Sequence, residues 1–361
     1  MLRSTHAAAL AAGLFAIGCS ERNPLAEPSL PLDPSLSTAP ASLPINVYGL
    51  GPLRRATPLS PCATGHARDF DFWLGEWQVV NPAGVTTANS RIAGALDGCA
   101  VLEFWFPIGG IPGRSLNGYD ADEGVWRQTW VPAAGRPFRM AGGLDAQGVM
   151  RMTGTRIATN GFHWIDTYAW TATSANHVDQ AVQFDLPEIN LHLAGSIPYD
   201  RVPSFTPGTL GTSLRCINGD AAETRALDFT VGRWRVVASN GLALGTSDVS
   251  IDPTLSGCLL EEIFTTPKGY ESRAFLYYDP VEDRYYRSSM DSEGNWVELR
   301  GAPIVSPLVL AGTEALPGRS DAQQRLSWEQ VSADHLRQTW SVSTDGGATW
   351  GAAAVLDFLR M

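Results

Sequence analysis

The 361-residue sequence is poor in lysine and cysteine, and it lacks the common catalytic motifs. Lys268 is the only lysine and the formal net charge is −11, so the chain lacks the basic surface by which proteins bind nucleic acid. It contains no G-x-S-x-G turn, no H-E-x-x-H helix and no phosphate-binding loop. Beyond its N-terminal segment, no apolar run reaches the roughly 20 residues that a membrane-spanning helix needs. Nucleic acid is therefore not an expected partner, and no common enzyme class is indicated.

The N-terminus resembles a bacterial export signal. Arg3 precedes the short apolar run Ala7–Gly18, which is too short to span a bilayer and predicts a signal peptide over residues 1–18. The small residues before Cys19 resemble the lipobox of bacterial lipoproteins. This resemblance implies lipidation of Cys19 and, because Ser20 follows, attachment to the outer membrane on its periplasmic side. The alternative is an ordinary cleavable signal with an incidental cysteine.

Residues 19–61 are rich in proline, serine and alanine, with eight prolines between positions 24 and 58. Proline blocks regular hydrogen bonding and favours extended chain. We expect a disordered tether here rather than a folded domain.

The rest of the chain contains the same pattern twice. Phe70–Val80 reappears as Leu227–Val237, and the offset between matching positions stays at 157 to 159 residues. Matching positions include Gly98, Cys99, Glu103 and Tyr119 with Gly257, Cys258, Glu262 and Tyr278. So long a match in constant order indicates a duplicated domain, with one copy over 62–208 and the second over 209–361.

Four cysteines remain after Cys19, and they fall two to each copy. Four cysteines allow three pairings, and the duplication favours Cys62 with Cys99 and Cys216 with Cys258. A single metal site is the alternative, but the close spacing of thiolate ligands is absent, so we expect no metal. Disulfides also agree with export to an oxidising compartment.

Each copy lacks helical periodicity. Short runs rich in Val, Trp, Tyr, Phe and Thr recur about every ten residues, separated by turn signals such as Asn81–Gly84 and Asp291–Gly294. This pattern predicts an all-β fold with an antiparallel meander of eight to ten strands, which closes into a barrel and so removes its exposed edges.

Gly75-Glu76-Trp77 and Gly232-Arg233-Trp234 resemble the Gly-x-Trp opening of the calycin superfamily, which includes lipocalins and fatty-acid-binding proteins. The wider pattern FDFWLGEW is similar to that of uncharacterised bacterial exported proteins. The resemblance implies two up-and-down β-barrels in which the tryptophan closes one end and a late arginine packs across it. Trp77 with Arg201, and Trp234 with Arg360, would then be structural residues.

Several residues are candidates for ligand binding. Trp126, Gln128 and Trp130 share one face of a predicted strand, near Tyr119, and either line an aromatic pocket or form plain core. Tyr278 is the counterpart of Tyr119 in the second copy.

Two carboxyl groups, Glu103 and Glu262, lie in apolar strands. The sequence favours an orientation toward solvent. The alternative is an inward position in which the carboxyl orients a ligand or serves as an acid or base.

The histidines and one glycine-rich turn suggest little chemistry. His177 and His335 are expected to be exposed in turns, with haem ligation as the alternative; His163 and His192 lie in predicted strands and are better placed for it. We therefore expect no cofactor.

Ser343–Trp350 resembles the Asp-box of sialidases, and a single occurrence indicates a tight turn held by Asp345.

The sequence thus supports three functional hypotheses. The first is a small apolar or amphipathic ligand bound within a barrel. The second, from resemblance to tandem calycin-like hydratases of isoprenoids, is an enzyme with a buried carboxyl as proton donor. The third is a structural or interaction module. Tyr285 and Ser289 replace Trp126 and Trp130 in the second copy, which favours the first barrel as the working one.

Overall fold

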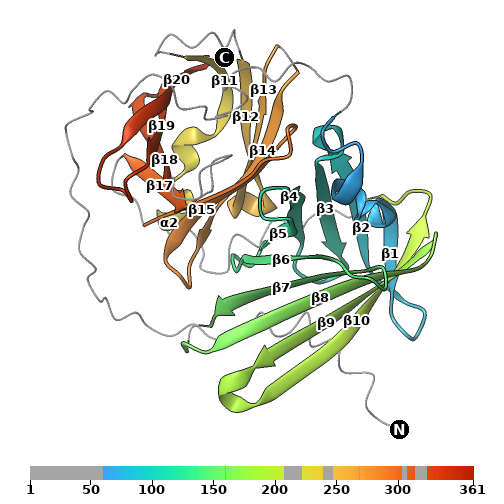
Figure 1. Ribbon diagram of the computed structural model, residues 1–361. Helices are drawn as coiled ribbons and strands as arrows, with labels where there is room; N and C mark the ends of the chain where they lie inside the picture. Colours follow the sequence, from blue (N-terminus) through green and yellow to red (C-terminus); the bar gives the residue numbers. More distant parts are fainter. Residues whose placement is uncertain are drawn as a thin grey trace.

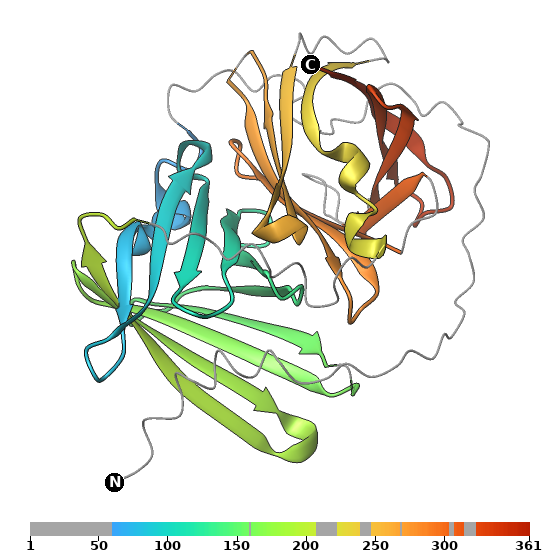
Figure 2. The same ribbon diagram turned by 180° about the vertical axis from the view of Figure 1, so that it is seen from behind.

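The computed structural model describes residues 60–158, 160–206, 222–238, 247–267, 269–302, 307–313 and 323–361. These residues form two closed antiparallel barrels of ten strands each, which lie side by side (Figures 1 and 2). The predicted all-β class with two tandem up-and-down barrels is confirmed. The predicted signal peptide, Cys19, the tether up to residue 59, and Cys216 lie outside the described residues. Within the described ranges, no helix is long and apolar enough to cross a membrane.

In the first barrel every strand pairs with the next one along the chain, and β1 pairs with β10 to close the sheet. The strands are β1 Gly75–Val80, β2 Thr86–Ala95, β3 Ala100–Pro107, β4 Gly113–Asp120, β5 Val125–Pro132, β6 Phe138–Leu144, β7 Val149–Ile157, β8 His163–Ser174, β9 His177–Leu186 and β10 Leu191–Val202.

The second barrel has the same order, closed by β11 and β20. Its strands are β11 Gly232–Ala238, β12 Ser247–Thr254, β13 Leu259–Thr265, β14 Glu271–Asp279, β15 Arg284–Asp291, β16 Trp296–Gly301, β17 Leu308–Thr313, β18 Gln323–Ser332, β19 His335–Ser343 and β20 Gly351–Arg360. One residue pair, Arg300 with Ala311, joins β16 to β17.

The Gly-x-Trp motif closes the base of each barrel. In the first barrel the guanidinium of Arg201 lies 4.1 Å from the ring centre of Trp77, and Trp77 Nε1 donates a hydrogen bond to the Trp73 carbonyl. Gly75 has φ of 142°, and a β-carbon there would lie 2.1 Å from Arg201 Nη1. Only glycine accommodates both the backbone angle and the arginine.

The second barrel repeats this base. Arg360 lies 4.2 Å from the ring centre of Trp234, and Gly232 has φ of 145° with the same close approach of the arginine. The motif is thus explained by packing at the closed end of each barrel.

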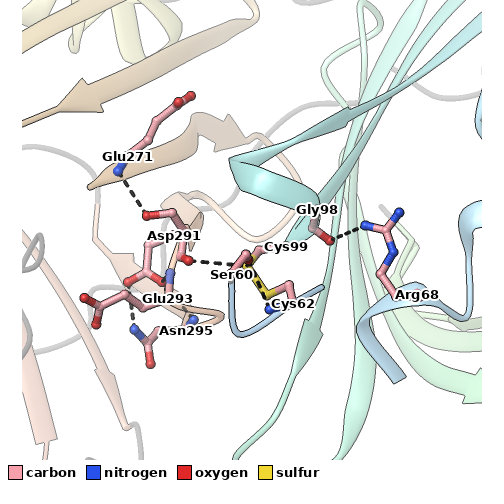
Figure 3. Close-up of a disulfide and its surroundings, with 10 residues drawn as sticks. Ser60, Cys62, Arg68, Gly98, Cys99, Glu271, Asp291, Glu293 and Asn295 are labelled. Carbon is pink, nitrogen blue, oxygen red and sulfur yellow. Dashed lines mark hydrogen bonds between the residues drawn. A yellow bond between two sulfur atoms is a disulfide. The ribbon is translucent and has the colours of Figure 1, made fainter. Parts of the chain in front are cut away.

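A disulfide joins Cys62 to Cys99 and ties the segment before β1 to the start of β3 (Figure 3). It lies against the second barrel, because Cys99 Sγ is 3.5 Å from the carbonyl oxygen of Ser292 in the β15–β16 turn. Cys258, the second copy's counterpart of Cys99, approaches the first barrel in the equivalent way, with its Sγ 3.3 Å from the Ala133 carbonyl in the β5–β6 turn. The contact between the barrels therefore has approximate two-fold symmetry.

An apolar cluster fills the space between the barrels. It includes Leu96, Leu102, Leu116 and Val131 of the first barrel and Leu255, Phe275, Tyr277 and Met290 of the second. Arg139 on β6 adds polar contacts between the barrels. Its guanidinium lies 3.8 Å from the ring centre of Tyr286, and it forms ion pairs with Glu282 and Glu298 at 3.1 and 3.4 Å. The outer face of the first barrel is thus buried along β3 to β6.

Candidate functional site

The strand register identifies which side chains face the interior of the first barrel. Directly opposed residues on neighbouring strands share a face of the sheet. One such row crosses β2 to β6 through Ile92, Glu103, Ser115, Trp130 and Phe138. Ile92 and Phe138 belong to the barrel's own core, so this whole row faces inward.

Along its axis the interior of the first barrel has three levels. We call the first the closed end, the second the polar ring and the third the aromatic mouth. The closed end consists of Phe70, Trp73, Trp77, Trp126 and Trp170. The polar ring consists of Ser90, Glu103, Ser115, Asn117, Gln128, Gln180 and Tyr199. The aromatic mouth consists of Trp105, Trp130, Trp164 and Tyr168.

The closed end is packed aromatic core. Phe70 stacks on Trp73 with ring centres 4.8 Å apart and meets Trp170 edge-on at 5.2 Å. Trp126 also packs on Phe70 edge-on, and its Nε1 donates to the carbonyl of His66 at 3.0 Å. All five aromatic side chains are at most 1% exposed, so this end leaves no room for a ligand.

The polar ring is a connected hydrogen-bond network. Gln128 donates to Asn117 Oδ1 at 2.5 Å, and Asn117 in turn donates to Ser115 Oγ and to the Val101 carbonyl, each at 2.8 Å. Buried polar groups need such partners, because an unpaired group reduces stability by its full desolvation penalty. The network therefore fixes the side chains beside Glu103.

Glu103 is the central group of this ring. Its Oε1 accepts hydrogen bonds from Ser90 at 3.0 Å and from Tyr199 at 3.4 Å, and the Tyr199 hydroxyl is shared with Gln180 Oε1 at 3.2 Å. Burial raises the pKa of Glu103 from 4.5 to about 8, although the hydrogen bonds from Ser90, Tyr199 and Ser115 oppose the rise. At neutral pH the carboxyl is therefore protonated and can itself donate a hydrogen bond.

The inward position of Glu103 and Glu262 corrects the expectation that both face solvent. Glu103 is 4% exposed and Glu262 is 1% exposed. The strand that holds Glu103 is apolar on both faces because Leu102, on the outer face, packs against the second barrel. The usual contrast between a wet and a dry face is lost in such a strand, and the direction of the glutamate cannot be read from it.

The aromatic mouth faces inward and is still reached by solvent. Trp105, Trp130, Trp164 and Tyr168 are only partly buried, although each lies on the inner face. Trp130 lies over Gly113, where a β-carbon would come within 2.3 Å of the indole. The mouth lies next to the polar ring, since Trp105 and Tyr199 have ring centres 6.1 Å apart.

One ion pair lies in the wall beside the mouth. Arg156 Nε and Nη2 donate to the two carboxylate oxygens of Asp166 at 2.6 and 3.1 Å, in a bidentate arrangement. The guanidinium also lies 5.6 Å from the ring centre of Phe138 and 5.4 Å from that of Trp164. The positive charge of Arg156 is thus already matched by a buried carboxylate.

The same positions in the second barrel have different chemistry. Glu262 is paired with Arg287, whose Nη2 donates to Oε1 at 2.7 Å, and both side chains are at most 2% exposed. Arg287 takes the register position of Gln128, and Leu276 that of Asn117. Phe358 replaces Tyr199. A buried ion pair therefore replaces the neutral side chains at these positions, while Gln338 keeps the place of Gln180.

The second barrel is also filled where the first has its mouth. Phe264, Ser289 and Leu326 take the positions of Trp105, Trp130 and Tyr168, and they are 0%, 5% and 0% exposed. At these three matched positions, only the first barrel has partly exposed side chains on its inner face.

The structure separates the residues that the sequence placed together as ligand contacts. Trp126 belongs to the closed end, with Tyr119 beside it at a ring-centre distance of 6.3 Å, whereas Gln128 lies in the polar ring and Trp130 in the mouth. Tyr278 packs against Tyr285 with ring centres 5.1 Å apart, and its hydroxyl donates to Asp283. Tyr119, Trp126 and Tyr278 therefore take no part in the candidate site.

Sequence reasoning missed Tyr199, Gln180 and Ser90 as partners of Glu103. The signal that could have found Tyr199 is its spacing of two residues before Arg201 on the last strand of the copy, which puts both on one face. Gln180 and Ser90 come from strands far apart along the chain, and only barrel closure brings them together.

The four histidines considered as ligands each pair with a carboxylate. His177 and His335, expected to be exposed, are partly buried and paired with Asp200 and Asp357 at 2.6 and 2.8 Å. His163 and His192 are exposed and bonded to Glu188 and Asp185. No group of three or more His, Cys, Asp or Glu side chains that could hold a metal ion occurs in the described part of the chain.

The Asp345 turn has the expected arrangement. The Asp345 carboxylate accepts hydrogen bonds from the Thr349 hydroxyl at 2.6 Å, from the Thr349 backbone at 2.9 Å and from Ser343 Oγ at 2.7 Å, and these bonds lower its pKa to about 2. Trp350 closes the turn by donating to the Gly347 carbonyl at 3.1 Å.

Comparisons with known proteins add little to this geometry. No protein-family model matches the chain, and no curated protein matches it. Among solved structures the chain is similar to a protein of unknown function of the DUF3598 family from Nostoc punctiforme, at 9% sequence identity and a TM-score of 0.20. The match covers 82% of this chain and 100% of that one. A likeness at this score supports no particular function, so the role of the barrels must be inferred from their own residues.

Proposed function

We propose that the first barrel binds a small apolar molecule through its aromatic mouth, and that the second barrel supports it as a scaffold. One observation carries this proposal: Trp105, Trp130 and Tyr168 face inward yet stay partly exposed, while their three counterparts in the second barrel are buried.

The energetics favour such a ligand. Covering apolar surface contributes roughly 25 cal/mol per Å², and aromatic side chains supply large areas of it with a defined geometry. Binding sites for small molecules are mostly apolar with a few placed polar groups. Here the mouth supplies the apolar wall, and Glu103 in the polar ring lies two residues before Trp105 on β3.

A dye titration tests this proposal. N-phenyl-1-naphthylamine, a neutral apolar dye, becomes fluorescent when it leaves water. We expect the full chain to bind one dye molecule, and Trp130→Ser, which copies Ser289 of the second barrel, to weaken binding by roughly tenfold. Trp350→Ser removes an indole from the Asp345 turn of the second barrel and should leave dye binding unchanged. A dye that stays dark, or equal losses in both variants, would contradict the proposal.

Glu103 supports a second candidate function, acid catalysis. A carboxyl kept protonated at neutral pH can give a proton to a bound alkene, accept one back from the water that then adds, and so complete a hydration. Under this candidate Glu103→Gln abolishes hydration of an isoprenoid alkene but keeps dye binding. Turnover that persists in the variant would exclude Glu103 as the proton donor.

We also propose that the protein is exported and anchored to the bacterial envelope through lipidated Cys19. The Cys62–Cys99 disulfide supports this location, because such bridges persist in oxidising compartments. Labelling of growing cells with radioactive palmitate should mark the wild-type chain and not Cys19→Ser. Equal labelling, or none in either, would leave an ordinary cleaved signal as the explanation.

A further inference from the structure

We propose that the ligand of the first barrel is electrically neutral and presents a carbonyl oxygen to Glu103. This inference rests on the proposed binding function and specifies its chemistry. It follows from the hydrogen-bond donors, the charges and the comparison between the two barrels.

The first step concerns the carboxyl group of Glu103 as a hydrogen-bond donor. Ser90 and Tyr199 both direct their hydroxyl groups at Oε1 of Glu103. The Ser115 hydroxyl is a third group that hydrogen-bonds to this carboxyl. A protonated carboxyl carries its hydrogen on Oε2, the oxygen to which Ser90 and Tyr199 do not donate. The pKa of about 8 supports this protonated form at neutral pH. A buried O–H group gains most from an acceptor that is itself uncharged and needs little desolvation, such as a ketone or an aldehyde oxygen.

The second step concerns charge. Along the inner face of the mouth and polar ring, the described residues include one cation, Arg156, which is held bidentately by Asp166. Asp166 is 1% exposed, so the pair brings no net positive charge to the site. A carboxylate ligand would enter a low-dielectric site that already contains Glu103 and Asp166, with no unmatched cation to compensate its desolvation.

The third step comes from the second barrel. There the position of Gln128 holds Arg287, which neutralises Glu262, and the position of Tyr199 holds Phe358. The chain can therefore place a cation at this depth of a barrel, and the first barrel has instead a neutral amide and a phenol. The difference favours recognition of an uncharged polar group in the first barrel.

A matched set of three naphthalenes tests the inference by calorimetry at about pH 6, where Glu103 is protonated. The set is 2-acetylnaphthalene with a carbonyl, 2-ethylnaphthalene with no acceptor, and 2-naphthoate with a negative charge. We expect the ketone to bind about 3- to 10-fold more tightly than the ethyl compound, and the carboxylate to bind at least about 10-fold more weakly than the ketone.

Two variants locate the effect. Glu103→Gln keeps a donor, its amide N–H, and should retain the preference for the ketone within about 3-fold. Glu103→Met removes the donor and should bind the ketone and the ethyl compound equally. Circular dichroism checks that the methionine variant folds; if it does not, the wild-type series still decides the matter.

The outcomes separate the two proposals. Binding of none of the three compounds would remove the proposed binding function itself. Equal binding of ketone and ethyl compound, or tightest binding of the carboxylate, would overturn the neutral-carbonyl inference and leave apolar binding standing. A ketone preference that survives Glu103→Met would assign the contact to another group and overturn it as well.

Discussion

The protonation of Glu103 makes a direct prediction about stability. Its pKa is about 8 in the folded protein and 4.5 in the unfolded chain, because folding buries the carboxyl. Below about pH 4.5 both states hold the proton, and stability is fully present. As the pH rises toward 8 the unfolded chain releases the proton while the folded protein keeps it, so stability falls over this window.

The magnitude follows from the same two values. One pH unit corresponds to about 1.4 kcal/mol, so the interval from 4.5 to about 8 amounts to about 5 kcal/mol. Local relaxation and water entry reduce such penalties, so this figure is an upper bound. Glu103→Gln keeps the shape and removes the ionisation. We expect the variant to match the wild type near pH 4.5 and to be more stable by roughly 2–5 kcal/mol above pH 8.

Urea unfolding at a series of pH values, followed by tryptophan fluorescence, measures this difference. The second barrel supplies the matched control, Glu262→Gln. This substitution removes the buried carboxylate that pairs with Arg287, so it should destabilise by roughly 3–5 kcal/mol. The two equivalent substitutions are thus expected to change stability in opposite directions at neutral pH.

One result would refute the reasoning. If Glu103→Gln destabilises the protein at pH 8 as much as Glu262→Gln does, then the Glu103 carboxyl is ionised in the folded protein. The neutral polar ring would then not exist in the form described.

Three further changes test the parts that hold the barrels in shape. Cys62→Ser with Cys99→Ser opens a loop of 37 residues and should lower the free energy of unfolding by about 3–4 kcal/mol in urea; an unchanged midpoint would mean that the bridge adds no stability. Gly75→Ala forces a β-carbon against Arg201 at positive φ and should cost roughly 2–4 kcal/mol, seen as a lower melting temperature, whereas an unaltered one would exclude the steric explanation. Arg139→Ala removes the ion pairs between the barrels and should cost about 2 kcal/mol and raise protease sensitivity; resistance equal to the wild type would show that the apolar contact suffices.

Local patterns were readable from the sequence because their causes are local. The turns can be recognised by Asp and Gly at fixed spacing. Asp345, for example, accepts hydrogen bonds from residues two and four positions away. The alternation of Trp126, Gln128 and Trp130 placed them on one face, which the register confirms. Period-two alternation does not say at which depth of the barrel each side chain lies, so it did not separate the closed end from the mouth.

The sequence by itself determined the all-β class and the two closed sheets. The repeat, the spacing of the strands and the Gly-x-Trp motif are patterns along the chain that need no knowledge of tertiary contacts. Tertiary structure alone decided which way Glu103 points, since that depends on the second barrel covering the outer face of β3. It also decided that Ser90, Gln180 and Tyr199 surround this carboxyl, because closing the sheet joins strands more than a hundred residues apart. The chemistry of the site arises from that closure: it removes the carboxyl from water and supplies its hydrogen-bond partners at the same time.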